Sequence, residues 1–231
     1  MNYIILNGKK STMVKGLMIQ SLPPISKPLM RTRIDEIDGR DGDIISKLGF
    51  SAYDKIMSIG LFGDFDIDEV IDYFNSEGEV IFSNEIDKKY MYQIIDQINF
   101  ERLARFRQAE VAFHVQPFKY SSADDVQTIS LTGKSSFTLE NRGNTESRPT
   151  LTFTGNGSIT VTIGSGTFSF SLSNSSITLD GEAMNAYIGS ALANRSVSGD
   201  YNKLRLQKGT NTIAISGSLS SVVAQKVSRW I

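Results

Sequence analysis

Apolar and polar residues alternate along most of the second half of the chain. One face of each run is apolar and the other is serine and threonine, over 151–153, 159–163, 168–172, 177–179, 204–206 and 213–215. A period of two is typical of half-buried β-strands. Turn signals separate the runs at 155–157, 164–166, 180–181 and 208–209. This half is therefore predicted to be an antiparallel β-sandwich or jelly roll.

The first half contains one segment with helical periodicity, at about 66–77. Four apolar residues there fall at i, i+3, i+4 and i+7, namely Ile67, Val70, Ile71 and Phe74. They form one apolar stripe. Asp66 is placed to cap the helix, Glu69 to complete a capping box, and Gly78 to follow its end. The pattern predicts a single amphipathic helix.

Strands are predicted for the rest of the first half. The expected ranges are 2–6, 13–20, 28–37, 51–60, 79–83, 88–98 and 102–118. Within the last range Val111, Phe113 and Val115 share one face. The opposite face carries His114 between Ala112 and Gln116. The pattern of this half is therefore mixed, with strands and one α-helix.

Composition and charge change near residue 121, which indicates two domains. Residues 1–120 contain 10 serines and threonines and 15 aromatic residues, whereas 121–231 contain 34 and 7. The formal charge is -3 in the first part (15 basic, 18 acidic) and +2 in the second (9 basic, 7 acidic). The small polar stretch 120–125 reads as a linker. We expect one domain at 1–122 and another at 123–231.

The chain has little equipment for catalysis. It contains no cysteine and only one histidine, His114, so cysteine nucleophiles and multi-histidine metal sites are excluded. We interpret His114 as a strand residue satisfied by a neighbour or by water. The net charge of -1 lacks the basic footprint of a duplex-binding protein. No signal peptide or membrane-spanning segment is expected, and no cofactor is predicted.

Two short motifs have an ordinary structural interpretation. The acidic run Asp64–Asp68 resembles the start of a calcium loop, but Glu69 and Asn75 stand where glycine and glutamate are required. A helix start with acidic residues in its first turn is favoured instead. The stretch Gly164–Gly166 precedes a strand, so a hairpin turn is favoured over a phosphate-binding loop.

Two segments carry candidate interface residues. Arg40 and Asp41 lie between Gly39 and Gly42, in either a surface hairpin tip with a local Arg–Asp pair or a loop that contacts another subunit. Three arginines follow on the expected late strand, namely Arg102, Arg105 and Arg107. Nearby acidic residues roughly neutralise them, so a paired strand face or protein interface is favoured over a nucleic-acid patch.

These segments resemble the distal tail proteins, the Dit family, of long-tailed phages of Gram-positive bacteria. The resemblance rests on Asp38–Gly42, on 94–107 and on Phe113–Tyr120. It extends more weakly to Glu140–Thr145 and Tyr201–Asn211 in the second half.

The resemblance implies a structural role in the virion, at the tail tip or baseplate. It implies that the N-terminal domain is a β-sandwich with one α-helix that forms a homo-hexameric ring. It also implies that the C-terminal domain is a galectin-like β-sandwich of the jelly-roll type. The ring would join the tail-tube protein to a lysin-like tail-tip hub protein. DNA would cross its lumen without sequence-specific binding, and no enzymatic activity is implied. A neutral to acidic lumen is expected because each neutralised phosphate adds affinity.

Two other function classes have recognisable requirements. A carbohydrate-binding module or host-receptor adhesin would need a surface groove lined by aromatics such as Tyr187, Tyr201 or Trp230. A hydrolase would need clustered carboxylates. The second half has seven acidic residues, namely Asp124, Asp125, Glu140, Glu146, Asp180, Glu182 and Asp200. Their scatter argues against a catalytic pair.

Overall fold

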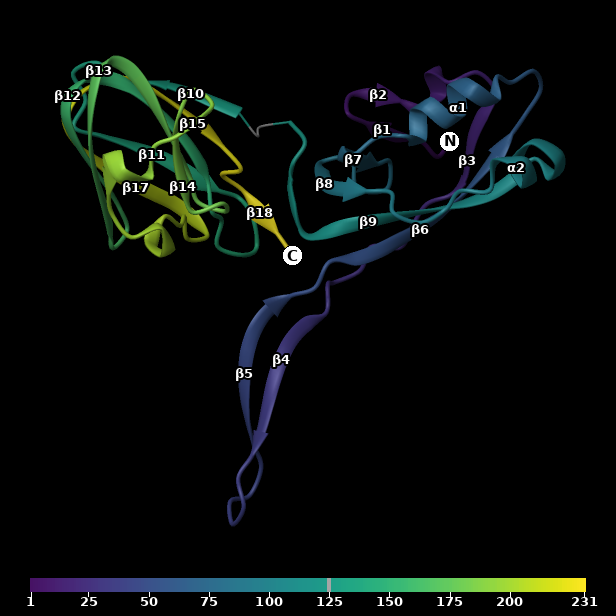
Figure 1. The fold of residues 1–231 in the computed structure, drawn as a ribbon, viewed down its shortest axis with the longest axis horizontal. Helices are drawn as coiled ribbons and strands as arrows, with labels where there is room; N and C mark the ends of the chain where they lie inside the picture. Colours follow the sequence, from purple (N-terminus) through teal and green to yellow (C-terminus); the bar gives the residue numbers. More distant parts are fainter. Residues whose placement is uncertain (124–125) are drawn as a thin grey trace. The chain divides into compact units, whose positions relative to one another are not determined.

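The computed structural model describes residues 1–123 and 126–231, and the chain folds into two compact units (Figure 1). Unit 1 comprises Met1–Ser122 together with Ile231, and unit 2 comprises Ala123–Trp230. Both units are built mainly from curled β-sheets, which confirms the predicted fold class. Asp124 and Asp125 of the predicted linker lie outside the described residues.

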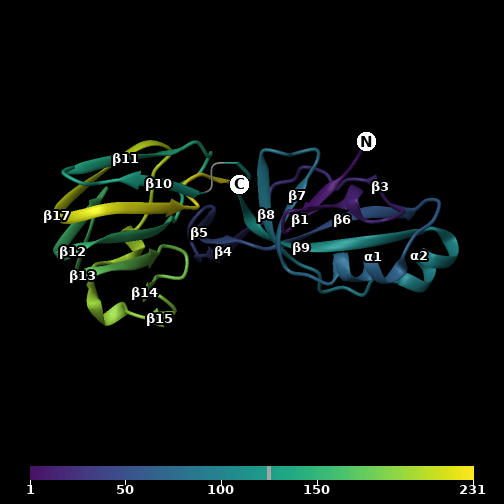
Figure 2. The same cartoon turned by 90° about the horizontal axis from the view of Figure 1, so that it is seen from above.

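Unit 1 is built on one curled antiparallel sheet in the order β2-β1-β7-β8-β9-β6-β3 (Figure 2). Its strands are β1 (Ile4–Leu6), β2 (Lys9–Lys10), β3 (Leu17–Ser21), β6 (Tyr53–Leu61), β7 (Gly78–Phe82), β8 (Lys88–Gln93) and β9 (Gln108–Ser121). The two longest, β6 and β9, pair directly, with Tyr53 opposite Val115.

The core of unit 1 is centred on Phe113. Its ring makes edge contacts with Phe74, Phe82 and Tyr92, at centroid distances of 6.5, 5.6 and 5.2 Å. Such edge-to-face pairs add to the stabilisation from apolar burial. Val111, Phe113 and Val115 are fully buried, so the predicted inward face of β9 is confirmed.

Helix α1 (Ile67–Phe74) confirms the predicted helix but is shorter than expected. The Asp66 carboxylate accepts hydrogen bonds from the backbone N–H groups of Asp68 and Glu69, at 3.0 and 3.4 Å. Glu69 does not complete a capping box; its carboxylate accepts from the backbone N–H of Lys15 at 3.2 Å. Gly78 was also misplaced, because it begins β7 rather than ending the helix.

A second helix, α2 (Phe100–Phe106), replaces the first part of the strand predicted at 102–118. Asn99 caps it by accepting a hydrogen bond from the Arg102 backbone N–H at 2.8 Å. Only Leu103 is buried in this helix, so the sequence contains no repeated apolar positions at helical spacing from which the helix could be predicted. The prediction of a single helix was therefore wrong, and Arg102 and Arg105 lie on a helix.

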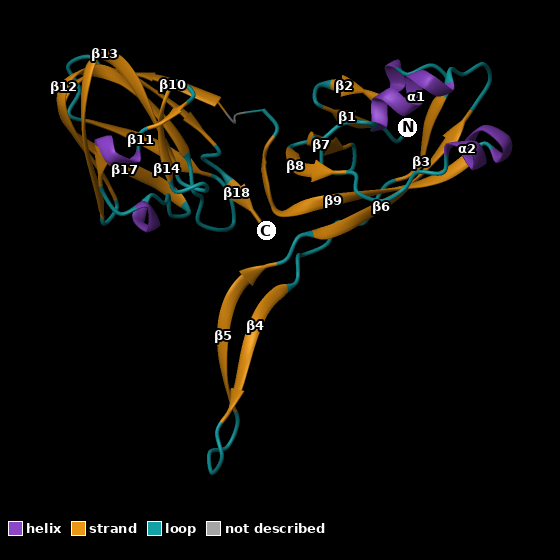
Figure 3. Cartoon of the chain, viewed as in Figure 1, coloured by secondary structure: helices purple, strands orange, loops and turns teal. Residues whose placement is uncertain are grey.

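A two-stranded hairpin forms a sheet of its own in unit 1. Its strands are β4 (Met30–Glu36) and β5 (Asp43–Phe50), and Figure 3 shows the hairpin standing clear of the larger sheet. We call it the arm. The strand predicted at 28–37 is confirmed as β4, but β5 had no counterpart among the predicted strands. Its exposed residues lack the alternation that marks a half-buried strand.

Unit 2 is a second antiparallel assembly in the order β10-β17-β12-β13-β14-β15, with β11 added to β17 and β16 to β13. Its strands are β10 (Val126–Ser130), β11 (Ser136–Asn141), β12 (Thr150–Ile163), β13 (Gly166–Asp180), β14 (Asn185–Ile188), β15 (Ala191–Leu192), β16 (Val197–Ser198) and β17 (Gly209–Gln225). The short strand β18 (Arg229–Trp230) follows β17 along the chain and is not part of this sheet. Gly164 lies in the turn of the β12–β13 hairpin, as predicted.

Three long strands bend at one level and fold unit 2 over a single core. The register of β12 shifts between Gly155 and Gly157 against β13, and near Asn156 against β17. Beyond the bend, Phe170 contacts Phe153 from the other half of the fold, at a ring-centroid distance of 5.7 Å. Because β-bulges bend strands, each long strand contributes to both halves. The turn predicted at Gly155–Gly157 is therefore wrong.

The predicted run around Leu204 and Leu206 also forms no named strand. Tyr201–Lys203 is a 3-10 helix, and Leu206 makes only an isolated bridge to Ser147. Both leucines are buried in the core of unit 2. The alternation of Leu204 and Leu206 with polar residues therefore results from the burial of both side chains, not from pairing in a β-sheet.

Replacing the α1 cap tests the helix boundary. We expect Asp66→Ala to lower the free energy of unfolding by about 1 kcal/mol, because two backbone N–H groups lose their acceptor. Urea unfolding monitored by circular dichroism measures this. The matched control is Asp64→Ala, whose side chain is 95% exposed, with an expected change of roughly 0.5 kcal/mol or less. Equal losses in both variants would contradict the capping role.

Candidate functional site

The arm exposes apolar side chains that no other part of the described chain covers. Ile34 and Ile45 are direct cross-strand partners, yet they are 56% and 61% exposed. Further aliphatic residues on the arm are also exposed, namely Ile37, Ile44 and Leu48. An isolated two-stranded hairpin is only marginally stable in water. The arm thus has the properties of a surface that another chain covers.

Arg40 and Asp41 lie at the tip of the arm, in a tight turn. The Arg40 backbone N–H donates to the Ile37 carbonyl at 3.1 Å, and Gly39 and Gly42 both have positive φ. The local ion pair of the arm joins Arg33 to Asp35 at 2.8 Å. The side chains of Arg40 and Asp41 have no hydrogen-bond or ion-pair partner among the described residues. The tip is therefore available for contact with another molecule.

The three late arginines lie together around α2. Arg105 forms an exposed i,i+4 ion pair with Glu101 at 2.9 Å, and Arg102 is exposed on the same helix. Arg107 ends the helix in a left-handed conformation, and its guanidinium lies 4.3 Å from the centre of the Phe65 ring. These three arginines, with Phe62 and Phe106, which are 78% and 74% exposed, are called the α2 face.

The structure does not bring the two candidate groups together within one chain. The arm strands pair only with each other in the described structure, whereas α2 packs on β9, β6 and α1. Their charges are opposite. Residues 33–43 carry five acidic and two basic residues, a net -3, whereas 100–107 carry three arginines and one glutamate, a net +2. Arginine and aromatic residues are also enriched at interface hot spots.

A buried ionic cluster lies where the main sheet meets the segment leading to the arm. Glu85 accepts a hydrogen bond from Lys119 Nζ at 2.9 Å and another from the Tyr90 hydroxyl. Lys55 Nζ donates to the Pro24 carbonyl at 2.7 Å. It also lies 4.9 Å from the centre of the Tyr90 ring, within cation–π range. We call Lys55, Glu85, Tyr90 and Lys119 the root cluster.

The root cluster holds two lysines against one carboxylate. Burial lowers the pKa of Lys55 to about 8, although the nearby Glu85 carboxylate opposes this shift. Burial favours protonated Glu85, but hydrogen bonds from Tyr90 and Lys119 and both ammonium charges outweigh it and lower the pKa of Glu85. Burial and Glu85 raise the pKa of Tyr90. The carboxylate is therefore the ionised partner that both lysines require.

Sequence reasoning missed the root cluster, although one signal pointed to it. Lys55 stands in register with Tyr53 and Met57 on the inward face of β6, and it is only 3% exposed. A lysine at an inward position of an alternating strand predicts a buried partner. The identity of that partner depended on β8 and β9 lying beside each other.

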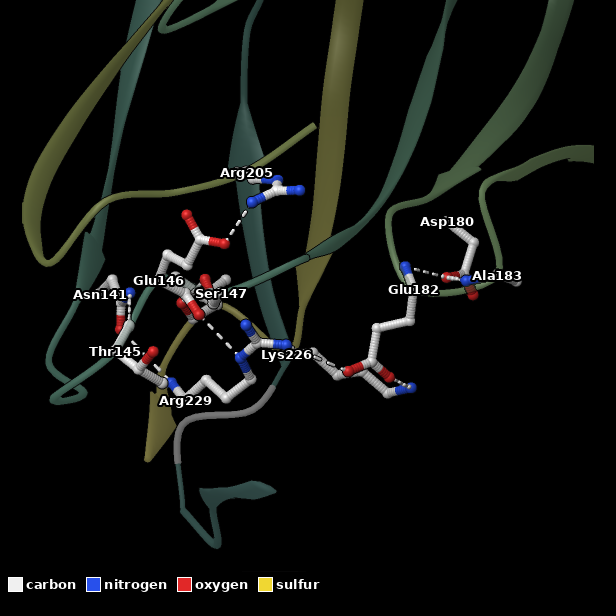
Figure 4. A network of polar contacts seen from close by, with 11 residues as sticks. Asn141, Thr145, Glu146, Ser147, Asp180, Glu182, Ala183, Arg205, Lys226 and Arg229 are labelled. Carbon is white, nitrogen blue, oxygen red and sulfur yellow. Dashed lines mark hydrogen bonds and ion pairs between the residues drawn. The ribbon is translucent and has the colours of Figure 1, made fainter. Parts of the chain in front are cut away.

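Unit 2 contains a polar network that fastens its last segment (Figure 4). The Arg229 guanidinium donates to the Glu146 carbonyl at 2.7 Å and lies 3.7 Å from the Glu182 carboxylate. Lys226 pairs with Glu182 at 3.2 Å, and Arg205 pairs with Glu146 at 2.5 Å. These carboxylates lie beside basic groups and hold loops in place. The arrangement lacks the paired, unneutralised carboxylates that glycoside hydrolysis uses.

The other acidic residues in the described part of unit 2, namely Asp180, Asp200 and Glu140, also have structural contacts. Asp180 accepts from the backbone N–H groups of Glu182 and Ala183, both at 2.9 Å. Asp200 accepts from the Asn202 N–H at 3.0 Å, and Glu140 pairs with Arg142 at 3.2 Å. Asp124 and Asp125 lie outside the described residues.

His114 has the neighbour that its strand position predicted. Its Nδ1 lies 2.7 Å from the carboxylate of Asp54, the residue opposite it on β6. Within 1–123 and 126–231, no three histidine or acidic side chains converge as a metal site requires. In the same ranges, no helix is long and apolar enough to cross a membrane.

The three aromatic residues considered for a sugar groove do not line the cavity beside loop 131–135 and β17. Tyr201 packs edge-on against Phe168 at a centroid distance of 5.8 Å, and Tyr187 is half-buried on β14. Trp230 belongs to the short strand β18.

Comparison with solved structures shows a likeness that spans the whole chain. The fold matches the Dit (gp 19.1) protein of phage SPP1 with a TM-score of 0.69 and 13% identity, over 100% of both chains. That protein is described as a paradigm of the hub adsorption apparatus in phages infecting Gram-positive bacteria. A chain of the phage P2 baseplate in its activated conformation with Ca matches with a TM-score of 0.50 and 10% identity, over 97% of this chain and 98% of that one.

Sequence comparisons gave no further relative. No protein-family model matches the chain, and no curated protein matches it. At these identities the structural likeness establishes a shared fold.

Removing the Glu85 charge tests the root cluster. We expect Glu85→Gln to lower the free energy of unfolding by about 3–5 kcal/mol, because it leaves two buried ammonium groups without a carboxylate. Urea unfolding at pH 7 measures this. The control is Glu79→Gln, which breaks the Lys89 pair of a half-exposed glutamate and has an expected cost of about 1 kcal/mol or less. A small loss in Glu85→Gln would contradict the cluster's role.

The lowered pKa of Lys55 predicts a rise in stability between pH 8 and 10. In this window unfolded Lys55 keeps its proton, with a pKa near 10.5, while the folded residue loses it above about 8. Because the unfolded state binds more protons, the free energy of unfolding increases with pH. We expect it to gain about 1–2 kcal/mol relative to Lys55→Met between pH 7.5 and 9.5. A constant difference between the two proteins would contradict the shift.

Proposed function

We propose that this protein is a structural component of a phage tail tip or baseplate. Its copies form a hexameric ring through unit 1, and the ring joins the tail tube to the tail-tip hub. The observation that carries the proposal is the full-length likeness to the SPP1 Dit protein. Neither solved neighbour is described as an enzyme, and the proposal includes no catalytic step.

The surfaces of unit 1 supply the two unlike patches that a ring requires. A head-to-tail interface joins two different surfaces of neighbouring copies. The copies form a closed ring when the rotation from one copy to the next is a whole fraction of 360°. We infer that the arm of one subunit packs against the α2 face of the next. The arm offers aliphatic side chains, and its distal part, residues 33–43, carries a net charge of -3. The α2 face offers aromatic rings, and residues 100–107 carry a net +2. Opposite potentials of this kind select the correct partner.

This contact gives the candidate residues definite roles. Asp41 and its acidic neighbours at the tip face Arg102 and Arg105 of the adjacent subunit. Ile34 and Ile45 are covered on assembly, which removes the exposed cross-strand pair from water. Arg40 lies beside Asp41 in the same contact, and Arg107 holds the end of α2 against the Phe65 loop.

The electrostatics of unit 1 also suit a passage for DNA. Affinity for a duplex grows with each phosphate that lysine or arginine neutralises. Residues 1–120 carry a net -3, so the proposed ring has no excess of positive charge with which to retain DNA. The tail-tube and hub proteins are the proposed neighbours on its two faces, and the virion is the proposed location.

Solution mass and paired charge reversal test the ring together. We expect light scattering of the full chain over a range of concentrations to reach the mass of six 25.5 kDa subunits, with annular particles in negative stain. Reversing the arm, Asp38→Arg with Asp41→Arg, should raise the concentration for half-assembly by roughly tenfold or more. Reversing α2, Arg102→Glu with Arg105→Glu, should do the same.

Combining the two reversals should restore assembly, because the charges are again opposite. The matched control is Lys203→Glu with Lys208→Glu on exposed positions of unit 2, which should leave the mass unchanged. A combined variant no better than either reversal alone would contradict the arm–α2 contact. A monomer at every concentration would contradict a ring that closes by itself.

A further inference from the structure

A cavity lies in unit 2, where two strands separate along β17. β11 pairs with β17 up to Ala214, and β10 pairs with it from Ser221 onward. Between these points the loop 131–135 is fastened only at its ends. The Leu131 N–H donates to the Ser220 carbonyl at 2.8 Å, and the Ile215 N–H donates to the Ser135 carbonyl at 2.7 Å. A cavity of about 670 Å³ opens here, and we call it the corner pocket.

Glycine fixes the shape of the corner pocket. A Cβ on Gly155 would lie 2.4 Å from the Ser218 carbonyl oxygen, and one on Gly217 would lie 2.4 Å from that of Ser158. Gly217 also has a φ of +110°. The backbones of β12 and β17 therefore meet at distances that only glycine permits. One wall of the pocket is backbone held in place by the fold, and it is formed before any ligand arrives.

The side chains around the corner pocket offer hydrogen bonds and one positive charge. Its lining includes Lys134, Asn156 and Asn174, and it contains no carboxylate and no aromatic ring. None of these three side chains has a hydrogen-bond or ion-pair partner among the described residues. Each asparagine amide provides two donors and one acceptor oxygen. Leu131 and Leu219 give the pocket an apolar floor.

This chemistry excludes several ligand classes. A divalent cation such as calcium requires carboxylate ligands, which the lining lacks. Single-stranded nucleic acid requires aromatic stacking and a track of basic residues, whereas this lining has one lysine. A largely apolar ligand would leave the asparagine amides unpaired and desolvated. The volume is within the usual range for small-molecule sites.

We propose that the corner pocket binds a sugar unit that carries a carboxylate or a phosphate group. The ring hydroxyls pair with the side chains of Asn156 and Asn174. The C–H face of the ring lies on Leu131 and Leu219. The acidic group pairs with Lys134, the one charged residue of the lining. This site is independent of the ring and of the aromatic residues considered above.

Saturation-transfer NMR on the full chain tests this assignment with four probes. They are D-glucuronic acid, D-glucose 6-phosphate, D-glucose and inorganic phosphate. We expect both acidic sugars to bind, glucose to bind roughly tenfold more weakly because it lacks the charged contact, and phosphate alone to give no competition. The two acidic sugars distinguish a carboxylate source from a phosphate source.

Variants place the binding in the corner pocket. Lys134→Ala should weaken the acidic sugars to the level of glucose, and Asn156→Ala should weaken all three sugars by roughly tenfold. The matched control is Lys208→Ala, an exposed lysine outside the pocket, which should change nothing. Light scattering should give all three variants the mass of the unaltered protein, which separates this test from that of the ring.

Three results would overturn the assignment. They are no sugar signal at all, acidic-sugar binding that persists in both pocket variants, and phosphate that competes as strongly as the acidic sugars.

Discussion

The arm imposes the constraint on which the rest of this protein depends. Two strands that pair only with each other leave their outer backbone edges and several isoleucines in water. No side chain in 1–123 or 126–231 covers this surface, and a lone hairpin gains little stability from its own hydrogen bonds. In the proposed ring, a second copy would cover both the backbone edges and the isoleucines. The arm would be the donor surface and the α2 face the matching acceptor.

The root cluster explains how an exposed hairpin leaves the sheet in a defined direction. Lys55 holds the Pro24 carbonyl, and the Tyr53 hydroxyl donates to the Ser26 carbonyl at 3.5 Å, so the segment before β4 is tied to β6. Burying two ammonium groups is costly, and one carboxylate with aromatic neighbours offsets only part of that cost. A well-packed apolar cluster of similar volume would hold the sheet without fixing that carbonyl. The ionic arrangement favours a specific geometry at the base of the arm.

In unit 2 a small number of long strands encloses the hydrophobic core. Its three longest strands bend through glycine or a bulge and serve both halves of the sandwich, so Phe153 and Phe170 meet across one core. The bend has a consequence at the surface. The corner pocket opens where β11 has stopped pairing with β17 and β10 has not yet begun to pair with it. Core construction and candidate binding site therefore have the same origin in the bent strands.

Local pattern by itself determined the mainly β class, the α1 helix with its Asp66 cap, and the inward face of β9, because alternation and capping depend on neighbours in sequence. The sequence also identified Arg40, Asp41 and the three arginines Arg102, Arg105 and Arg107 as candidate interface residues, which stays a prediction. Helix α2 was not predicted, because a single buried residue, Leu103, cannot produce a helical period of apolar positions. Only the tertiary structure decided that Gly155–Gly157 is a bend within a strand rather than a turn. It also decided that the Glu85 carboxylate lies beside two buried lysines, and that the apolar side chains of the arm are exposed. Each of these depends on which distant strands lie side by side, and burial and ion pairing are properties of that arrangement.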